Sequence, residues 1–211
     1  MGKNCPLCSA DSKPYYQDSA AEYLHCTRCD LVFVPPLFHL SSDEEKQRYD
    51  QHQNNPNDQR YRQFLAQLVT PVSKHIKPGS KGLDFGSGPG PTLSVMLTKY
   101  GCQMDLFDKF YANNLAVFNN KYDFICATEV VEHLNNPKFE LQRLLEILKS
   151  GGVLALMTQM INEKVEFSSW YYKNDPTHIC FFSKQTMRYL AKIYGTKLEL
   201  YGDNVALFIK D

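Results

Sequence analysis

Four cysteines near the amino terminus constrain the fold of this chain more than any other feature of its sequence. They form two CxxC pairs, "CPLC" (Cys5 and Cys8) and "CTRC" (Cys26 and Cys29), with residues 9–25 between them. A two-residue gap lets both sulfurs of a pair reach one tetrahedral ion, and this separation of the pairs is typical of a four-thiolate zinc ribbon. We therefore expect residues 1–36 to fold around a structural zinc ion, since four thiolates leave no open coordination position.

Two other interpretations of these cysteines are weaker. Disulfides require an oxidising compartment, whereas the start "MGKNCP" has no apolar signal core and carries Pro6 where a myristoylation motif has Ser or Thr. A cytoplasmic location is the default expectation. A redox dithiol would need a single CxxC in a thioredoxin-like setting. Cys102, Cys126 and Cys180 lie in apolar runs and are expected to be small core residues.

The charge balance and hydropathy of the chain argue against two classes of partner. The 211 residues include 23 basic and 23 acidic side chains. Residues 1–34 carry slightly more acidic than basic residues, whereas a module that follows a phosphate backbone is basic. No apolar run reaches the roughly 18 residues of a transmembrane helix. We expect no nucleic acid and no membrane among the partners, and nothing in the sequence indicates an oligomeric state.

The second strong signal is the stretch "GLDFGSGPGPTLSVMLTKY" (residues 82–100). A short apolar strand runs into a glycine-rich loop, which lets the backbone approach a ligand closely, and a helix begins near Pro91. The next strand, "CQMDLFD", ends on Asp108, where an acid can accept hydrogen bonds from ribose hydroxyls. A nicotinamide-binding unit fits less well, because its third glycine would fall at Pro91 and Asp84 would face a pyrophosphate. An acid suits a cationic ligand better, such as S-adenosylmethionine, which has no phosphate.

Four ordered motifs resemble the class I S-adenosylmethionine-dependent methyltransferases. "LDFGSGPG" is similar to their motif I, "DLFD" to their ribose-binding motif, "YDFICATEVVEHL" to their fourth strand and turn, and "LLEILKSGGVLALMT" to their fifth-strand region. "CPLC…CTRCDLVFVPP" and "DPTHICFF" extend the resemblance to a zinc-ribbon subgroup, and sugar C-methyltransferases have a similar front end. The resemblance implies an α/β, Rossmann-like sheet of seven strands in residues 79–211, with an antiparallel last strand. Between Asp108 and Tyr122 there is room for little of the third strand, which leaves the adenine pocket undefined.

Ligands of such sheets bind at the carboxyl ends of the strands, near the point where the strand order reverses. The resemblance therefore places one cofactor cleft at that edge. Its expected cofactor-binding residues are Asp84, Gly86, Ser87, Gly88, Gly90, Asp108, Thr128 and Glu129.

The stretch "CATEVVEHL" puts Glu129, Glu132 and His133 on one face of a helical turn. A similar run in ubiquinone-pathway O-methyltransferases would make these residues magnesium ligands. Histidine is an unusual ligand for magnesium, so we favour His133 as an acceptor-side base or orienter over a magnesium site. Structural support of the turn is the remaining interpretation.

Two segments are expected to approach the same cleft. Residues 37–78 predict a helical connecting or lid segment, in which Tyr49 and His52 either contact substrate or belong to a solvated helix end. The stretch "SSWYYKNDPTHICFF" is expected to arch over the cleft, and its candidate substrate contacts are Trp170, Tyr171 and Tyr172. The alternative for these aromatic residues is a hydrophobic plug beneath the sheet.

Methyl transfer requires alignment of donor and acceptor, and often a base for the acceptor's proton. His133 and His178 are the candidate bases, because imidazole titrates near neutral pH. We favour a methyltransferase acting on a small molecule such as a sugar or another metabolite. An RNA methyltransferase and a non-catalytic cofactor-binding scaffold are the alternatives, and the sequence does not identify the acceptor atom.

Overall fold

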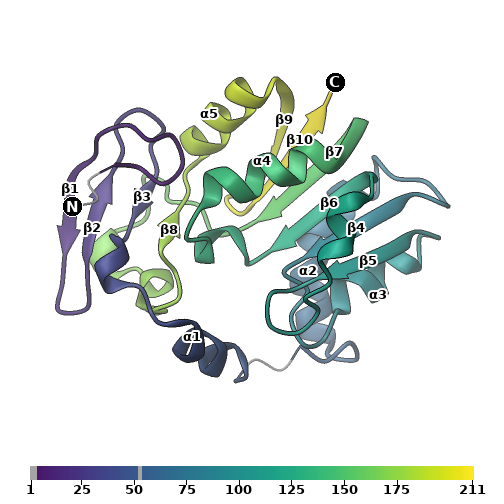
Figure 1. Cartoon of the computed structure of the whole chain (residues 1–211), viewed down its shortest axis with the longest axis horizontal. Coiled ribbons are helices and arrows are strands. Elements are labelled where there is room, and N and C mark those ends of the chain that lie inside the picture. The colour runs from purple at the N-terminus through teal and green to yellow at the C-terminus, as the bar shows by residue number, and fades with distance from the viewer. Residues whose placement is uncertain (1–3, 52–53) are drawn as a thin grey trace.

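The computed structural model describes residues 4–51 and 54–211. Within these residues the chain forms two β-sheets and five α-helices (Figure 1). The strands of the larger sheet are β4 (Lys81–Phe85), β5 (Gln103–Phe107), β6 (Tyr122–Thr128), β7 (Leu148–Met157), β9 (Thr196–Tyr201) and β10 (Val205–Lys210). The smaller sheet contains β1 (Lys13–Gln17), β2 (Glu22–His25), β3 (Val32–Phe33) and β8 (Cys180–Phe181). The helices are α1 (Ser42–Tyr49), α2 (Gln59–Val72), α3 (Thr92–Thr98), α4 (Pro137–Ile147) and α5 (Lys184–Tyr194).

The larger sheet has the order β5-β4-β6-β7-β10-β9. Strands β4 to β7 pair in parallel, and the last strand, β10, is antiparallel to both of its neighbours. This arrangement confirms the expected Rossmann-like α/β fold. The expected number of seven strands is wrong for the described residues, which form six. Residues 108–121 are too short for a crossover helix and a further parallel strand, so they form a 3-10 helix, Leu115–Asn119, instead.

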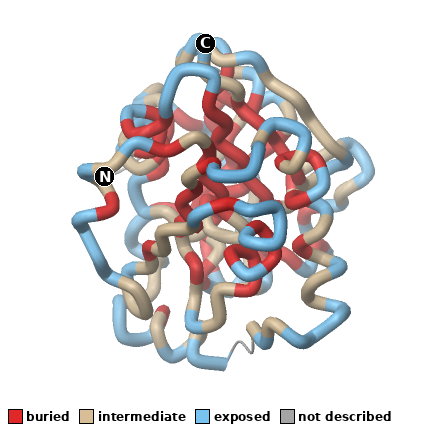
Figure 2. Tube along the Cα trace, turned by 90° about the vertical axis from the view of Figure 1, so that its right-hand side faces the viewer, coloured by how far each residue is buried: buried red, intermediate tan, exposed pale blue. Residues whose placement is uncertain are grey.

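Helices cover both faces of this sheet. Side chains on β6 alternate between the two faces, so that Phe124 and Cys126 pack with α2 and α3 while Ile125 and Ala127 pack with α4 and α5. Figure 2 shows the resulting distribution, with buried residues in the interior and exposed residues around them. Cys102, Cys126 and Cys180 are buried, as expected. Among the helices that the structure describes, none has the length and apolar character to cross a bilayer.

Local signals in the sequence set most helix ends. Asn136 caps α4 with Pro137 in its first turn, and Ser183 caps α5, which ends at Gly195 in the left-handed conformation. Ser41 caps α1 and forms a capping box with Glu44. Glu45 lies outside this cap and is largely buried.

The small sheet is completed by a strand from the other end of the sequence. β3 pairs with β8 through Val32–Phe181 and Phe33–Cys180, and the Val34 N–H donates to the Ile179 carbonyl at 2.9 Å. One hydrophobic cluster runs from the cysteine-rich segment into the face of the large sheet that carries α4 and α5. The amino-terminal segment is therefore fixed to the segment that follows β7, as Figure 1 shows.

Candidate functional site

A cavity of about 500 Å³ lies at the carboxyl ends of β4, β5 and β6. One part of its wall is the glycine-rich loop after β4 together with Asp108. The opposite part holds His133 and His178, and α1 contributes Glu45 and Tyr49. All eight of the expected cofactor-binding residues line this cavity: Asp84, Gly86, Ser87, Gly88, Gly90, Asp108, Thr128 and Glu129.

The glycine loop depends on backbone that only glycine adopts easily. Gly86 and Gly88 have φ values of 77° and 63°. A Cβ at Gly86 would lie 2.3 Å from a methyl carbon of Val130, and one at Gly90 would lie 2.2 Å from the Asn54 carbonyl oxygen. The loop therefore fits tightly between the turn after β6 and the residue Asn54, with its backbone turned toward the cavity.

Asp108 holds two loops together. Its Oδ2 accepts a hydrogen bond from Gly88 N–H at 2.9 Å, and its Oδ1 accepts from Phe110 and Tyr111 N–H groups at 2.8 and 3.1 Å. A carboxylate has about four lone-pair sites, so further acceptor capacity remains for a ligand in the cavity. Asp108 can organise the loops and bind ligand hydroxyls at the same time.

Two acids, the buried Asp84 and the half-buried Glu129, line the end of the cavity beside the glycine loop. Asp84 accepts a hydrogen bond from Ser94 Oγ at 2.9 Å, and burial raises its pKa to about 6. Glu129 has a φ of 53°, a left-handed conformation that is uncommon for residues other than glycine. Burial, followed by the neighbouring Glu132, raises the pKa of Glu129 to about 9. A bound cation would stabilise the ionised form of both acids.

Glu129, Glu132 and His133 do not share one face of an α-helix. Only Val131–His133 forms a turn, of the 3-10 type, and Glu129 precedes it. The two carboxyl groups meet instead at Tyr172, whose hydroxyl donates to Glu132 Oε1 and lies 3.3 Å from Glu129 Oε2. Glu132 is fully buried, which raises its pKa to about 7.

The two candidate bases meet at the other end of the cavity. The rings of His133 and His178 have centroids 4.7 Å apart. His133 Nδ1 lies 3.0 Å from the Thr177 carbonyl oxygen, and His178 Nδ1 lies 2.6 Å from that of Tyr172. A carbonyl oxygen only accepts a hydrogen bond, so each Nδ1 carries a hydrogen.

The candidate substrate residues separate into different environments. Tyr49 lines the cavity, where its hydroxyl donates to Glu45 Oε1 at 2.9 Å and its ring contacts His133 edge-on. Tyr172 supports the acids described above. Trp170 packs in the core against Tyr172 and Phe181, and Tyr171 is exposed, so neither lines the cavity. His52 lies outside the described residues.

The aromatic residues of the 167–181 segment face the cysteine-rich segment more than the cavity. Phe167 contacts the rings of Tyr15, Tyr16 and Tyr23, which lie on β1 and β2. Lys173, whose side chain is largely buried, forms an ion pair with Asp18 at 2.7 Å. The high aromatic content of this stretch therefore reflects packing against the small sheet.

Polar contacts hold α1 over the cavity. Lys109 pairs with Glu45 at 2.6 Å, the Tyr111 hydroxyl donates to Asp50 at 2.6 Å, and Arg48 pairs with Asp175 at 3.3 Å. Sequence reasoning did not single out Lys109 or Tyr111, although their positions directly after Asp108 were a usable signal.

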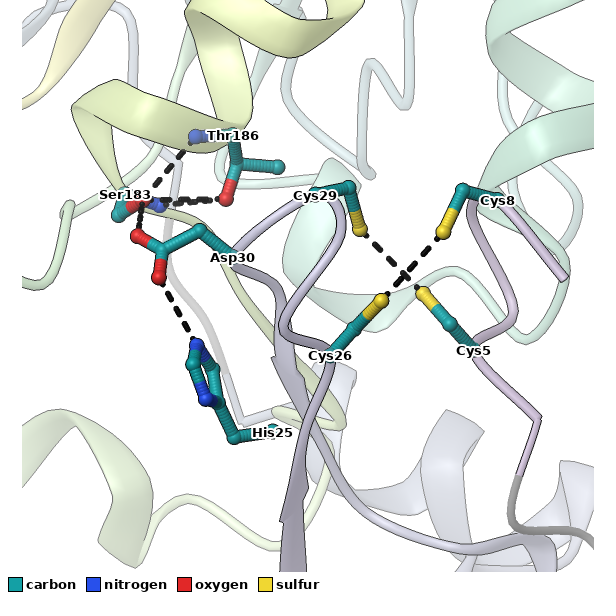
Figure 3. A network of polar contacts seen from close by, with 8 residues as sticks. All are labelled: Cys5, Cys8, His25, Cys26, Cys29, Asp30, Ser183 and Thr186. Carbon is teal, nitrogen blue, oxygen red and sulfur yellow. Dashed lines mark hydrogen bonds and ion pairs between the residues drawn. The ribbon is translucent and has the colours of Figure 1, made fainter. Parts of the chain in front are cut away.

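The four cysteines of the CxxC pairs form a separate cluster (Figure 3). Cys5 and Cys29 have sulfurs 3.5 Å apart, those of Cys8 and Cys26 are 3.4 Å apart, and all four lie within 4.8 Å of one another without a disulfide. Four sulfurs around one zinc ion at about 2.3 Å would be about 3.8 Å apart. The observed separations fit this arrangement with small adjustments.

The two CxxC turns have the same backbone structure. Ser9 N–H donates to the Cys5 carbonyl at 2.9 Å, and Asp30 N–H donates to the Cys26 carbonyl at 2.8 Å. Ser9 and Asp30 both have positive φ values. Asp30 also accepts a hydrogen bond from Ser183 Oγ, the cap of α5, as Figure 3 shows. The cluster is thereby connected to the carboxyl-terminal part of the chain.

Comparison with known families finds a match to the profile described as a methyltransferase domain, over residues 57–200. A comparison with curated protein sequences gives no match. The matched span contains the glycine loop, Asp108 and both cavity histidines.

Solved structures share the fold of this chain. A proposed sarcosine dimethylglycine methyltransferase from Galdieria sulphuraria is 22% identical, with a TM-score of 0.52 and coverage of 73% of this chain and 66% of the other. An O-methyltransferase family protein from Burkholderia thailandensis is 12% identical, with a TM-score of 0.52 and coverage of 79% and 63%. The chain thus spans just under two thirds of the length of each of these two proteins.

Proposed function

This chain belongs to the methyltransferase-domain family. We propose that it is an S-adenosylmethionine-dependent methyltransferase whose acceptor is a small molecule bound beside His133 and His178. The observation that carries this proposal is a single cavity that joins the glycine loop and Asp108 to the two histidines. A donor on the loop and an acceptor beside the histidines would share one enclosed space, as in-line transfer requires.

We assign the donor to the acid-lined end of the cavity. S-adenosylmethionine supplies a methyl group made electrophilic by a sulfonium centre. Asp108 would accept hydrogen bonds from the ribose hydroxyls, while Asp84 and Glu129 would face the cationic groups of the ligand. The lining of the cavity therefore fits a cationic nucleoside without phosphates.

We assign the acceptor to the end of the cavity formed by α1 and the histidines. Tyr49 would contact the acceptor, and His133 or His178 would take a proton from it through Nε2. The cavity volume of about 500 Å³ suits a small acceptor beside the donor. Helix α1 would act as a lid. The ion pairs and hydrogen bonds that hold it over the cavity can break to admit a ligand and form again afterwards.

We propose a structural zinc ion for the amino-terminal cluster. Cys5, Cys8, Cys26 and Cys29 would bind it as thiolates. Four cysteines complete the tetrahedral coordination of zinc, so the ion would stabilise the small sheet without taking part in methyl transfer.

Transfer of a labelled methyl group tests the acceptor class. The protein is incubated with methyl-labelled S-adenosylmethionine and a cell extract separated into small-molecule, RNA and protein fractions. We expect the label in the small-molecule fraction, and much less of it with the Asp108→Asn variant. Label that enters only RNA or only protein would contradict the proposed acceptor class.

The pKa of Asp84 predicts a pH dependence of cofactor binding. Below about pH 6 this carboxyl group is neutral in the free protein, and a cationic ligand favours its ionised form. Binding then requires loss of a proton, so affinity falls as pH decreases, approaching tenfold per pH unit. Above pH 7 the contribution of Asp84 is constant.

Calorimetric titration with S-adenosylmethionine at pH values between 5 and 7 measures this effect. The Asp84→Asn variant cannot ionise at this position and should bind more weakly, and its affinity should change less steeply with pH over this range, because only Glu129 is left to lose a proton. The prediction fails if the wild-type affinity does not change with pH, or if the variant keeps the same slope.

A further inference from the structure

We propose that Glu132, His133 and His178 form a second metal site, for a divalent transition-metal ion, at the acceptor end of the cavity. One carboxylate oxygen of Glu132 and one ring nitrogen of each histidine lie within 4.8 Å of one another. His133 ends the turn after β6, whereas His178 comes from the segment that precedes β8. The fold thus brings together ligands that lie far apart in the sequence.

Hydrogen bonds orient both histidines for such a role. Each Nδ1–H donates to a backbone carbonyl, that of Thr177 for His133 and that of Tyr172 for His178. A metal-binding histidine almost always donates its other N–H to a carbonyl or carboxylate, because this fixes the tautomer and the ring orientation. Nε2 is then the metal-binding atom in both rings.

Glu132 supplies an independent observation that points to a cation. Its side chain is fully buried, and Oε1 accepts the hydroxyl of Tyr172. Among the described residues, Oε2 has no hydrogen-bond partner, and no lysine or arginine forms an ion pair with this carboxylate. A buried carboxylate oxygen without a partner destabilises the fold, and a bound cation would remove that cost.

The chemistry of the three ligand side chains determines which metal ion the site would prefer. Two imidazoles and one carboxylate suit Fe²⁺, Mn²⁺, Co²⁺ or Zn²⁺, whereas Mg²⁺ prefers oxygen ligands and retained waters. This set differs from the magnesium set that the sequence resemblance implies, because His178 takes the place of Glu129. Three protein ligands leave coordination positions open, and His133 and His178 both line the cavity.

The proposed metal site favours methyl acceptors that carry a hydroxyl group. This inference rests on the proposed function. An acceptor with a hydroxyl group could place its oxygen on the ion, which would lower the pKa of that hydroxyl. Its proton would leave to water, and the oxygen lone pair would form the bond to the methyl carbon. The carbon–sulfur bonding electrons would return to sulfur, giving the neutral thioether product. The two histidines would then act through the ion instead of as direct bases.

Cobalt titration of the full-length protein tests the site. The protein is purified with its amino-terminal metal in place and titrated with Co²⁺, while calorimetry and visible absorption are recorded. We expect one equivalent of Co²⁺ to bind, as the second metal equivalent of the protein, without a thiolate-to-cobalt charge-transfer band, since the new ligands are nitrogen and oxygen. His178→Gln and His133→Gln should each weaken this second binding at least about tenfold.

Two matched variants serve as controls. Glu129→Gln removes the neighbouring acid that is not part of the set, and His75→Gln removes a histidine paired with Glu199 elsewhere on the molecule. Both should bind the second equivalent as the wild type does.

Three outcomes would overturn the inference: no binding of Co²⁺ by the wild type beyond its amino-terminal metal, undiminished Co²⁺ binding by His178→Gln, or loss of Co²⁺ binding in Glu129→Gln. S-adenosylhomocysteine binding is measured on the same samples. If the wild type does not bind S-adenosylhomocysteine, the proposed function is contradicted. If it binds S-adenosylhomocysteine but no second metal ion, only the proposed metal site is contradicted.

Discussion

Asp108→Asn is expected to weaken binding of S-adenosylhomocysteine by about 10- to 100-fold. The amide replaces one acceptor oxygen by a donor, so one ribose hydroxyl or one backbone N–H loses a charge-assisted bond worth about 1.5–3 kcal/mol. The loss extends to the loops, because Asp108 accepts from Gly88 on one side and from Phe110 and Tyr111 on the other. Isothermal titration calorimetry measures the change directly.

Asp105→Asn is the matched control. Asp105 lies on β5, the strand that Asp108 follows, and pairs with Lys81 at 2.9 Å, outside the cavity. Its substitution alters stability without touching the ligand site, so S-adenosylhomocysteine should bind within about twofold of the wild type. If both variants bind S-adenosylhomocysteine with equal affinity, Asp108 is not part of the cofactor site.

Sequence reasoning succeeded where the signal is local or where a motif defines a strand end. The glycines after β4, Asp108 at the end of β5, and the caps Asn136 and Ser183 each have a structural role within a few residues of their position. The carboxyl ends of neighbouring parallel strands meet at one edge, so the cofactor-binding residues converge on one cavity.

Features that depend on distant contacts could not be read from the sequence. β8 consists of two residues, and only its pairing with β3 makes it a strand. Trp170 was expected at the cleft, but whether an aromatic side chain faces a cavity or a neighbouring sheet depends on the packing partner, here the small sheet. The meeting of Glu129 and Glu132 at Tyr172 likewise joins segments separated by about 40 residues.

Because the small sheet is connected to the cavity, loss of the cysteine cluster should affect the cavity as well as the small sheet. β3 pairs with β8, which begins two residues after His178. Lys173 and Phe167 fix the same segment to β1, β2 and their connecting turn. Loss of the cluster should therefore displace the acceptor end of the cavity more than the glycine loop, which follows β4.

Cys29→Ser is expected to lose the bound zinc and to lower the melting temperature by about 10 °C or more. A structural zinc site contributes folding free energy outright, and a loss of about 3–5 kcal/mol corresponds to this shift for a chain of this length. Metal analysis and thermal unfolding followed by circular dichroism measure the two effects. At temperatures where the variant remains folded, methyl transfer should fall much further than S-adenosylhomocysteine binding, because His178 moves while Asp108 stays in place.

Cys102→Ser is the control for this prediction, since it makes the same substitution at a buried thiol outside the cluster. It should keep one equivalent of zinc, and its melting temperature should fall by less. Unchanged zinc content in Cys29→Ser would exclude the four-thiolate site. A parallel loss of transfer and of cofactor binding would show that the small sheet supports the whole domain and not the acceptor end in particular. The ratio of the two losses therefore separates a general folding role of the cysteine cluster from a specific one in positioning His178.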